Sequence, residues 1–390
     1  MTDSPYAVDA QRPIATVGDL VAHLYQAAQL EMSTIPLYLY AGYSIQTRSY
    51  SQWSPGVSAF RAIRSVVIEE MLHLSLVRNL MVAIGAGDQM RFYDERFLPT
   101  YPTRMLHRIP ALELPLEPCS RELMAQVFVP LELPEKADAP PEPHRYGTIG
   151  QFYAAIRLGF QALDTPSLWA NNRPDLQYTS AYWNQDGGGE PITVCDIQSA
   201  MQALDTIVEQ GEGARPHDTS VPIEPADPVL GEDELSHYAK FRRIADGIDG
   251  IGTVYPVPRN PRTADFEPPV RGLSDLFNAG YCFVLSMLDA IYTTSRSTVQ
   301  PGATSTRYGL ERNFIAAMGG LLFPVADLLV RTPLSGGQQH AAPTFQFHQF
   351  AEDQSKKAQL IRLCDDVASN YPELGGDNGV RWLISGLPAL

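Results

Sequence analysis

The feature that most constrains the fold is a Glu-x-x-His motif that occurs twice, each time on the apolar face of a predicted helix. The first copy is Glu70 and His73 within VVIEEMLHLSLVRNL, and the second is Glu234 and His237 within ELSHYAKF. Residues three apart project from the same face of a helix. Because the same face carries the apolar side chains that enter the core, both pairs are expected to be buried. A buried ionisable group must be paired, neutralised or bound to a metal.

Two further helices each offer an acidic residue to the same core. Glu31 lies in phase with the apolar stripe of a helix predicted over residues 16–46. On a helix predicted over about 193–210, the next position in phase with the apolar stripe is Glu212, which two glycines flank, whereas Glu209 continues the polar face. Phase therefore favours Glu212 over Glu209 as the inward carboxylate, and both remain candidates.

Together these helices carry the ligand inventory of a di-iron or di-manganese carboxylate bundle, which is one Glu, one Glu-x-x-His, one Glu and one Glu-x-x-His. We predict one or two iron ions, with manganese or zinc as alternatives, because Glu/His sites accept several divalent ions. The alternative is a set of buried Glu–His hydrogen bonds without metal. It would leave like charges close together with no cation between them. The predicted metal residues are Glu31, Glu70, His73, Glu209, Glu212, Glu234 and His237.

One neighbour of the first motif has two interpretations. Glu69 lies off the apolar stripe, so it is either a surface carboxylate or an outer partner of the metal ligands.

The remaining periodicity predicts an all-α protein. Strand signals are weak, and residues 88–148 are irregular and rich in proline. We expect the helices over 16–46 and 57–84 to form one hairpin, and those over about 193–210 and 232–247 to form the other. Residues 88–192 would be an elaborated crossover, with a short helix over 148–163. The predicted division is a metal-binding bundle over 15–255 and a C-terminal helical extension over 256–390, with helices near 272–296, 308–331 and 349–370.

Composition excludes several classes of function. Asp and Glu number 44 against 29 Lys and Arg, a formal charge of -15, so nucleic-acid binding is not expected. The four cysteines form no CxxC pair that would indicate a zinc or redox motif. The N-terminal residues lack the pattern of a signal peptide, and the longest apolar run, residues 314–326, is too short to span a membrane. We expect a cytoplasmic protein with no membrane partner.

Four segments carry a family resemblance. LEMSTIPLYLYAGYSI, IEEMLHLSLVRNLMVAIGA, IVEQGEG and ELSHYAKF resemble the ferritin-like domain of the iminophenyl-pyruvate dimer synthase type, and the likeness extends over about residues 15–350. That domain occurs in proteins that couple tryptophan-derived imines in violacein and related bisindole pathways. The resemblance implies a ferritin-like four-helix bundle with a long crossover insertion and additional C-terminal helices. It also implies metal positions at Glu31, Glu70, His73, Glu212 and His237, and carries over Glu209 and Glu234.

The expected function is that of a non-haem metal oxidoreductase in secondary metabolism. A reduced metal centre would use dioxygen to oxidise or couple a small substrate, which the resemblance suggests is derived from an amino acid. No catalytic acid or base is assigned, no organic cofactor is expected, and a homo-oligomer or a pathway partner enzyme is possible. The alternative is a non-catalytic ferritin-like protein that stores metal or acts as a scaffold, with or without a functional metal site.

Overall fold

The computed structural model describes residues 8, 12–47, 55–104, 111–134, 146, 148–179, 188–212, 235–297 and 306–390; side chains before residue 58 in the second helix and the side chain of Glu212 lie outside this description. The α-helices are α1 Val17–Ser44, α2 Pro55–Ala83, α3 Arg121–Leu123, α4 Val129–Leu131, α5 Ile149–Leu163, α6 Ile197–Glu212, α7 His237–Ala245, α8 Val270–Thr293, α9 Arg307–Ala317, α10 Phe323–Arg331, α11 Lys356–Ala368 and α12 Val380–Gly386. Two π-helical segments, Met124–Phe128 and Met318–Leu322, join α3 to α4 and α9 to α10. Short 3-10 turns span Gly87–Gln89, Pro174–Leu176, Thr263–Asp265 and Pro372–Leu374.

The described strands are two residues each and pair only with each other. β1 (Thr103–Arg104) runs antiparallel to β2 (Glu113–Leu114). The prediction of an all-α fold is therefore confirmed.

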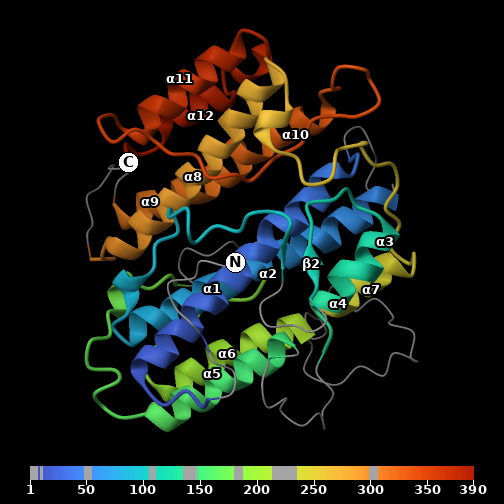
Figure 1. Cartoon of the computed structure of the whole chain (residues 1–390). Helices are drawn as coiled ribbons and strands as arrows, with labels where there is room; N and C mark the ends of the chain where they lie inside the picture. Colours follow the sequence, from blue (N-terminus) through green and yellow to red (C-terminus); the bar gives the residue numbers. More distant parts are fainter. Residues whose placement is uncertain are drawn as a thin grey trace, which may run out of the picture.

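Four helices close into a ring. α1 packs against α2 and α5, and α6 packs against α2 and α5, so each helix contacts two others. Figure 1 shows α5 and α6 lying side by side along the α1–α2 pair. The predicted hairpin of α1 and α2 is present. Its Thr16 cap is present too: the Thr16 hydroxyl accepts from the Asp19 amide at 3.1 Å, and the Asp19 carboxylate accepts from the Thr16 amide at 3.0 Å.

The second pair of the bundle differs from the prediction. We expected the helix at 232–247 to pair with the one at 193–210, but α5 takes that place beside α6. The reason is length: α7 has 9 described helical residues against 28 in α1. At about 1.5 Å per residue it is too short to run along the bundle.

The short helices gather at one end of the bundle. α7 packs against α2, α6, α3, α4 and the π-helical segment Met124–Phe128. Figure 1 places α3, α4 and α7 together there. This end therefore brings the residues after α4 and at the start of α7 close to the middle of α2.

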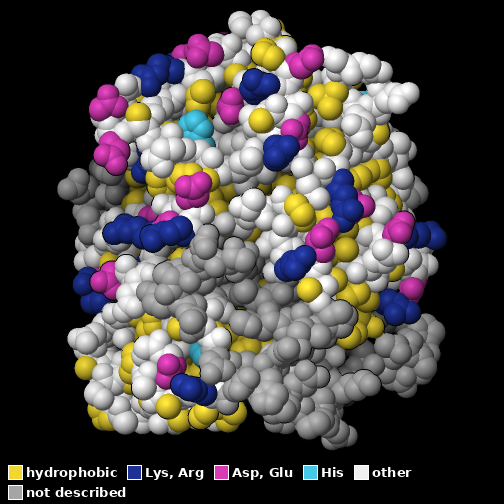
Figure 2. All heavy atoms as spheres, in the orientation of Figure 1, with side chains coloured by type: hydrophobic (Ala, Val, Ile, Leu, Met, Phe, Trp, Pro, Cys, Tyr) yellow, Lys and Arg dark blue, Asp and Glu magenta, His cyan; other side chains and the backbone are white. Residues whose placement is uncertain are grey.

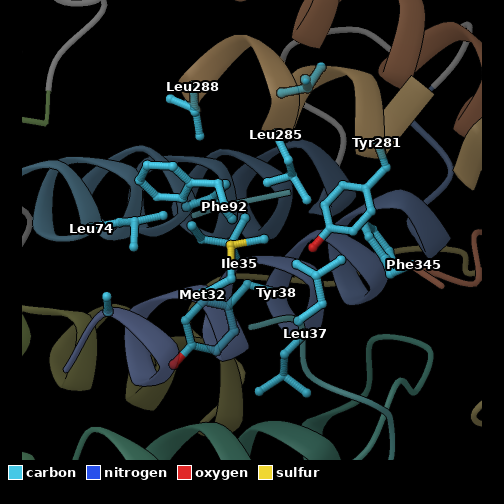
Figure 3. Packing of buried hydrophobic residues seen from close by; sticks show 14 of the residues in the cluster. Met32, Ile35, Leu37, Tyr38, Leu74, Phe92, Tyr281, Leu285, Leu288 and Phe345 are labelled. Atoms are coloured by element: carbon cyan, nitrogen blue, oxygen red, sulfur yellow. The ribbon is translucent and has the colours of Figure 1, made fainter. Parts of the chain in front are cut away.

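The C-terminal helices form a second layer on the bundle (Figure 1). α8 packs against α9, α10 and α11, α12 packs on α11, and α10 contacts α1. Figure 3 shows Leu285 and Leu288 of α8 packed over Met32 and Leu74 in one apolar cluster. One apolar core thus continues across the two layers. The division of the chain at residue 255 stays a prediction.

Two helices are long and apolar enough to cross a membrane by length and composition alone. The most apolar window of α8 is 83% buried, and that of the continuous helix Arg307–Arg331 is 50% buried. Burial of the α8 window inside the protein is what a core helix requires. On the face drawn in Figure 2, acidic and basic side chains are intermixed over the C-terminal layer.

Candidate metal centre

Two groups of buried acidic and imidazole side chains meet inside the bundle. One is Glu31, Glu70 and His73, and the other is Glu70, Glu132 and His237. Within each group the ligand atoms all lie within 4.8 Å of one another, and Glu70 belongs to both. Each of the five side chains has at most 4% of its surface exposed. One shared carboxylate with two flanking sets is the arrangement that binds two metal ions side by side.

Four helices bring these residues together. Glu31 lies midway along α1, and Glu70 and His73 lie on one face of α2. Glu132 follows the last residue of α4, and His237 is the first residue of α7. The Ser236 hydroxyl caps α7 by accepting from a backbone amide. Both short helices therefore end or begin at a candidate ligand.

The imidazoles direct one ring nitrogen each toward the carboxylates. His73 Nδ1 lies 3.5 Å from Glu31 Oε2. His237 Nδ1 lies 2.9 Å from Glu70 Oε1 and 3.6 Å from Glu132 Oε2. The two rings stack with their centroids 5.3 Å apart.

Each carboxylate accepts a hydrogen bond from one buried hydroxyl. Tyr153 donates to Glu31, and Tyr38 donates to Glu132. Thr34 Oγ1 donates to Glu70 Oε2 at 2.7 Å. Such outer partners fix the orientation of ligands around a metal.

Burial and mutual repulsion change the protonation of the carboxylates. Burial, reinforced by the charge of Glu31, raises the pKa of Glu70 to about 7. Burial also acts to raise the pKa of Glu31, but hydrogen bonding and attraction from His73 outweigh it and the pKa is lowered.

The pKa values of both imidazoles are raised, which favours their protonated forms. Burial acts to lower the pKa of both rings. The Glu31 carboxylate outweighs it and raises the pKa of His73. Glu132, Glu69 and Glu70 raise the pKa of His237 well above its usual range. Protons on these rings occupy the places that cations would take when metal displaces them.

The residues present fit a pair of divalent metal ions. Both ring nitrogens of His237 are buried and lack a hydrogen-bond partner, although carboxylate oxygens lie 2.9 and 3.1 Å away. Four carboxylates, those of Glu31, Glu69, Glu70 and Glu132, are buried here, and Lys240 is the described Lys or Arg that pairs with one of them. An oxygen-rich set with two imidazoles suits iron, manganese or zinc.

Four of the seven predicted metal residues converge on this centre: Glu31, Glu70, His73 and His237. Glu209 is exposed on α6 and belongs to neither group, because it continues the polar face of that helix. Glu234 and the side chain of Glu212 lie outside the described residues.

Glu132 was not predicted from the sequence. Its segment is rich in proline and was interpreted as irregular crossover. A signal was nevertheless present, because Met124, Phe128 and Glu132 are spaced by four and all three are buried. That spacing is the mark of one helical face.

The sequence left two interpretations of Glu69 open. Glu69 is 1% exposed, and its Oε2 lies 3.1 Å from His237 Nε2. It is therefore an outer partner of a candidate ligand rather than a surface carboxylate.

A ring of long helices around a buried Glu/His centre defines the class of helical carboxylate bundles. The family model for ferritin-like proteins matches residues 24–246, more than half of the chain, so the chain belongs to the ferritin-like family. A crystal structure of a ferritin-like protein from Caulobacter vibrioides superimposes with a TM-score of 0.52 at 20% identity, covering 86% of this chain and 100% of the other. This likeness shows the fold.

Two relatives of known name confirm the family resemblance. The chain is 27% identical to the dichlorochromopyrrolate synthase of Lentzea aerocolonigenes, over 86% of this chain and 36% of that protein. It is also 27% identical to the 2-imino-3-(indol-3-yl)propanoate dimerase of Chromobacterium violaceum, over 85% of this chain and 34% of that protein. The chain thus spans about a third of the length of these relatives.

Proposed function

We propose that the protein is a metal-dependent oxidoreductase that uses dioxygen to couple or oxidise a small, amino-acid-derived substrate in secondary metabolism. The observation that carries the proposal is the pair of buried Glu/His groups joined through Glu70. Iron is the metal we favour, with manganese or zinc as alternatives.

The names of the relatives support the substrate class. One is named for dimerising an iminopropanoate that carries an indole, and the other for making a chlorinated chromopyrrolate. We therefore propose a 2-imino-3-arylpropanoate as the substrate. Joining two such molecules by one new carbon–carbon bond removes two hydrogen atoms, which dioxygen can accept as hydrogen peroxide.

The residues of this chain have distinct roles in the proposal. Glu31, Glu70, His73, Glu132 and His237 would hold the metal. When bound, a redox-active metal pair would relay electrons from the substrate to dioxygen and would offer positions for dioxygen to bind. Hydrogen bonds from Tyr38, Tyr153 and Thr34 orient the carboxylates, and burial of all five ligands keeps bulk water from the centre.

The proposal extends to protein partners and cellular location. A pathway partner enzyme or a homo-oligomer belongs to the proposal. A cytoplasmic location, without nucleic-acid or membrane partners, also belongs to the proposal.

Metal analysis combined with oxygen uptake tests the proposal. About two irons per chain are expected in the parent protein, with uptake of dioxygen when 2-imino-3-(indol-3-yl)propanoate is generated in the cell of an oxygen electrode. Glu70→Ala should lose both metal and uptake, whereas Glu209→Ala, the exposed control, should keep both. A Glu70→Ala protein that retains metal and turnover contradicts the proposal. Bound metal without uptake on any imino acid supports the storage or scaffold alternative.

A further inference from the structure

The two imidazoles of the centre have outer partners of different charge. At His73, Nε2 lies 2.9 Å from Gln210 Oε1. The amide group of Gln210 donates to the Gly188 carbonyl at 3.2 Å, so its oxygen is the atom that faces His73. His73 Nε2 therefore carries the hydrogen, and Nδ1 is the atom offered to the carboxylates.

The partner of His237 is a carboxylate that has its own cation. Glu69 Oε2 lies 3.1 Å from His237 Nε2. Lys240 Nζ contacts both oxygens of Glu69, at 2.9 and 2.7 Å. Glu69 and Lys240 are both buried and form a close ion pair beside His237.

The other contacts of the two groups match. Both share Glu70, and each has one more carboxylate, Glu31 or Glu132. Each of these carboxylates accepts a hydrogen bond from a buried tyrosine. Among the described residues, the main difference in polar partners therefore lies behind the imidazoles: an amide behind His73, and a carboxylate behind His237.

This difference has a direct chemical consequence for binding. A carboxylate close to the outer nitrogen of a metal-bound imidazole raises the basicity of the ligating nitrogen through its negative charge, and a neutral amide does this less. The nitrogen that His237 offers to metal should therefore be the stronger donor.

We propose that the two metal positions are unequal, and that the position held by Glu132 and His237 fills before the one held by Glu31 and His73. Glu69 is the positioning residue that causes the difference, and Lys240 holds its carboxylate in place through contacts with both oxygens. This inference rests on the proposed metal centre and adds an order of filling to it.

Titration of the metal-free protein with zinc chloride tests the order. Calorimetry gives the affinity of each step, and NMR of the histidine side chains shows which ring responds first. The signals of His237 should shift in the first step and those of His73 in the second. Glu69→Gln should weaken the first step by about 10–100-fold and leave the second within about threefold. Gln210→Ala should weaken the second step alone.

The outcomes separate this inference from the proposed function. No zinc binding by the parent protein would contradict the metal centre itself. Two steps of equal affinity, or His73 responding first, would overturn the inference while the centre stands. Equal weakening of both steps by Glu69→Gln would also overturn it. The parent NMR titration decides the order even if Glu69→Gln does not fold, and Glu209→Gln is the matched control for a Glu-to-Gln change away from the centre.

Discussion

Among the described residues, the C-terminal layer buries one acid beside one base, whereas the centre of the bundle buries four carboxylates around two imidazoles and one lysine. In the C-terminal layer, Arg307 pairs with Glu311 one helical turn later, and both side chains are at most 1% exposed. The guanidinium also donates to backbone carbonyls, those of Leu176, Gln177, Ile291 and Thr294. In the bundle, Lys240 pairs with Glu69 and leaves the other three carboxylates to the imidazoles.

The difference separates a structural ion pair from a binding site. A matched pair with a satisfied guanidinium needs no further ion, and losing either partner leaves a buried charge. A surplus of carboxylates needs protons or cations before it can be buried. A buried carboxylate with a matching cation thus stabilises the C-terminal layer without a ligand. The surplus of buried carboxylates makes the stability of the bundle depend on the protons or metal ions that it binds.

The largest effect on stability is expected in the C-terminal layer. Arg307→Met leaves Glu311 buried without its cation and should lower the free energy of unfolding by about 3–5 kcal/mol. Arg331→Met is the control, because the Arg331–Asp327 pair is partly exposed and should contribute less than about 1 kcal/mol. Urea unfolding of the metal-free chain measures both. Equal losses of unfolding free energy in the two variants would contradict a special role for the buried ion pair.

The next effect belongs to the bundle and depends on ligand. Ferrous or zinc ion at about 100 times its dissociation constant should stabilise the parent by about 2.7 kcal/mol, because it binds the folded chain. Glu132→Ala should gain less than the parent, since it removes a carboxylate from one of the two groups. Thermal melts with and without metal measure the gain. A Glu132→Ala protein that gains as much as the parent would remove Glu132 from the centre.

A smaller effect concerns pH in the metal-free chain. The folded pKa of Glu70, about 7, lies above its ordinary value of 4.5, so folding takes up a proton there. This contribution is fully present below about pH 4.5 and is lost as the pH rises through 7. Glu70→Gln should therefore be more stable than the parent at pH 8, by about 1–3 kcal/mol, and match it more closely at pH 5. Unfolding curves at the two pH values check the sign; a variant less stable than the parent at pH 8 would contradict a surplus of negative charge.

The smallest effect is expected at Glu209. Its side chain is exposed, so Glu209→Ala should change stability by less than about 0.5 kcal/mol and leave metal content unchanged. Calorimetry and metal analysis on one preparation measure both. Loss of metal in this variant would restore Glu209 to the centre.

Helical phase in long periodic segments was enough to predict the fold class and much of the site. Glu31, Glu70 and His73 lie on apolar stripes that continue for several turns, and His237 begins a shorter stripe with Phe241 and Ile244, so the spacing predicts their burial. Glu132 follows short helical segments separated by a π-helical one, and Pro130 breaks the pattern further.

The partner of α6 was predicted wrongly for a different reason. Periodicity shows that a helix has a face to bury, but not which helix covers it. α5 and α7 both have such faces and both contact α6, and the longer of them, α5 with 15 residues against 9, lies in the four-helix ring. The outer partners of the ligands are equally hidden, because Tyr153 and Gln210 lie more than 100 positions from the residues they contact.

The ends of α4 and α7 have a consequence for how metal would enter and leave. The helical run that ends with α4, Arg121–Leu131, and the nine residues of α7 are both too short to be stable alone in water. Because Glu132 and His237 lie at their ends, an ion bound to both would crosslink α4 and α7 and stabilise this end of the bundle. Exchange of the ion would then follow local separation of α4 and α7, while α1, α2, α5 and α6 stay packed together.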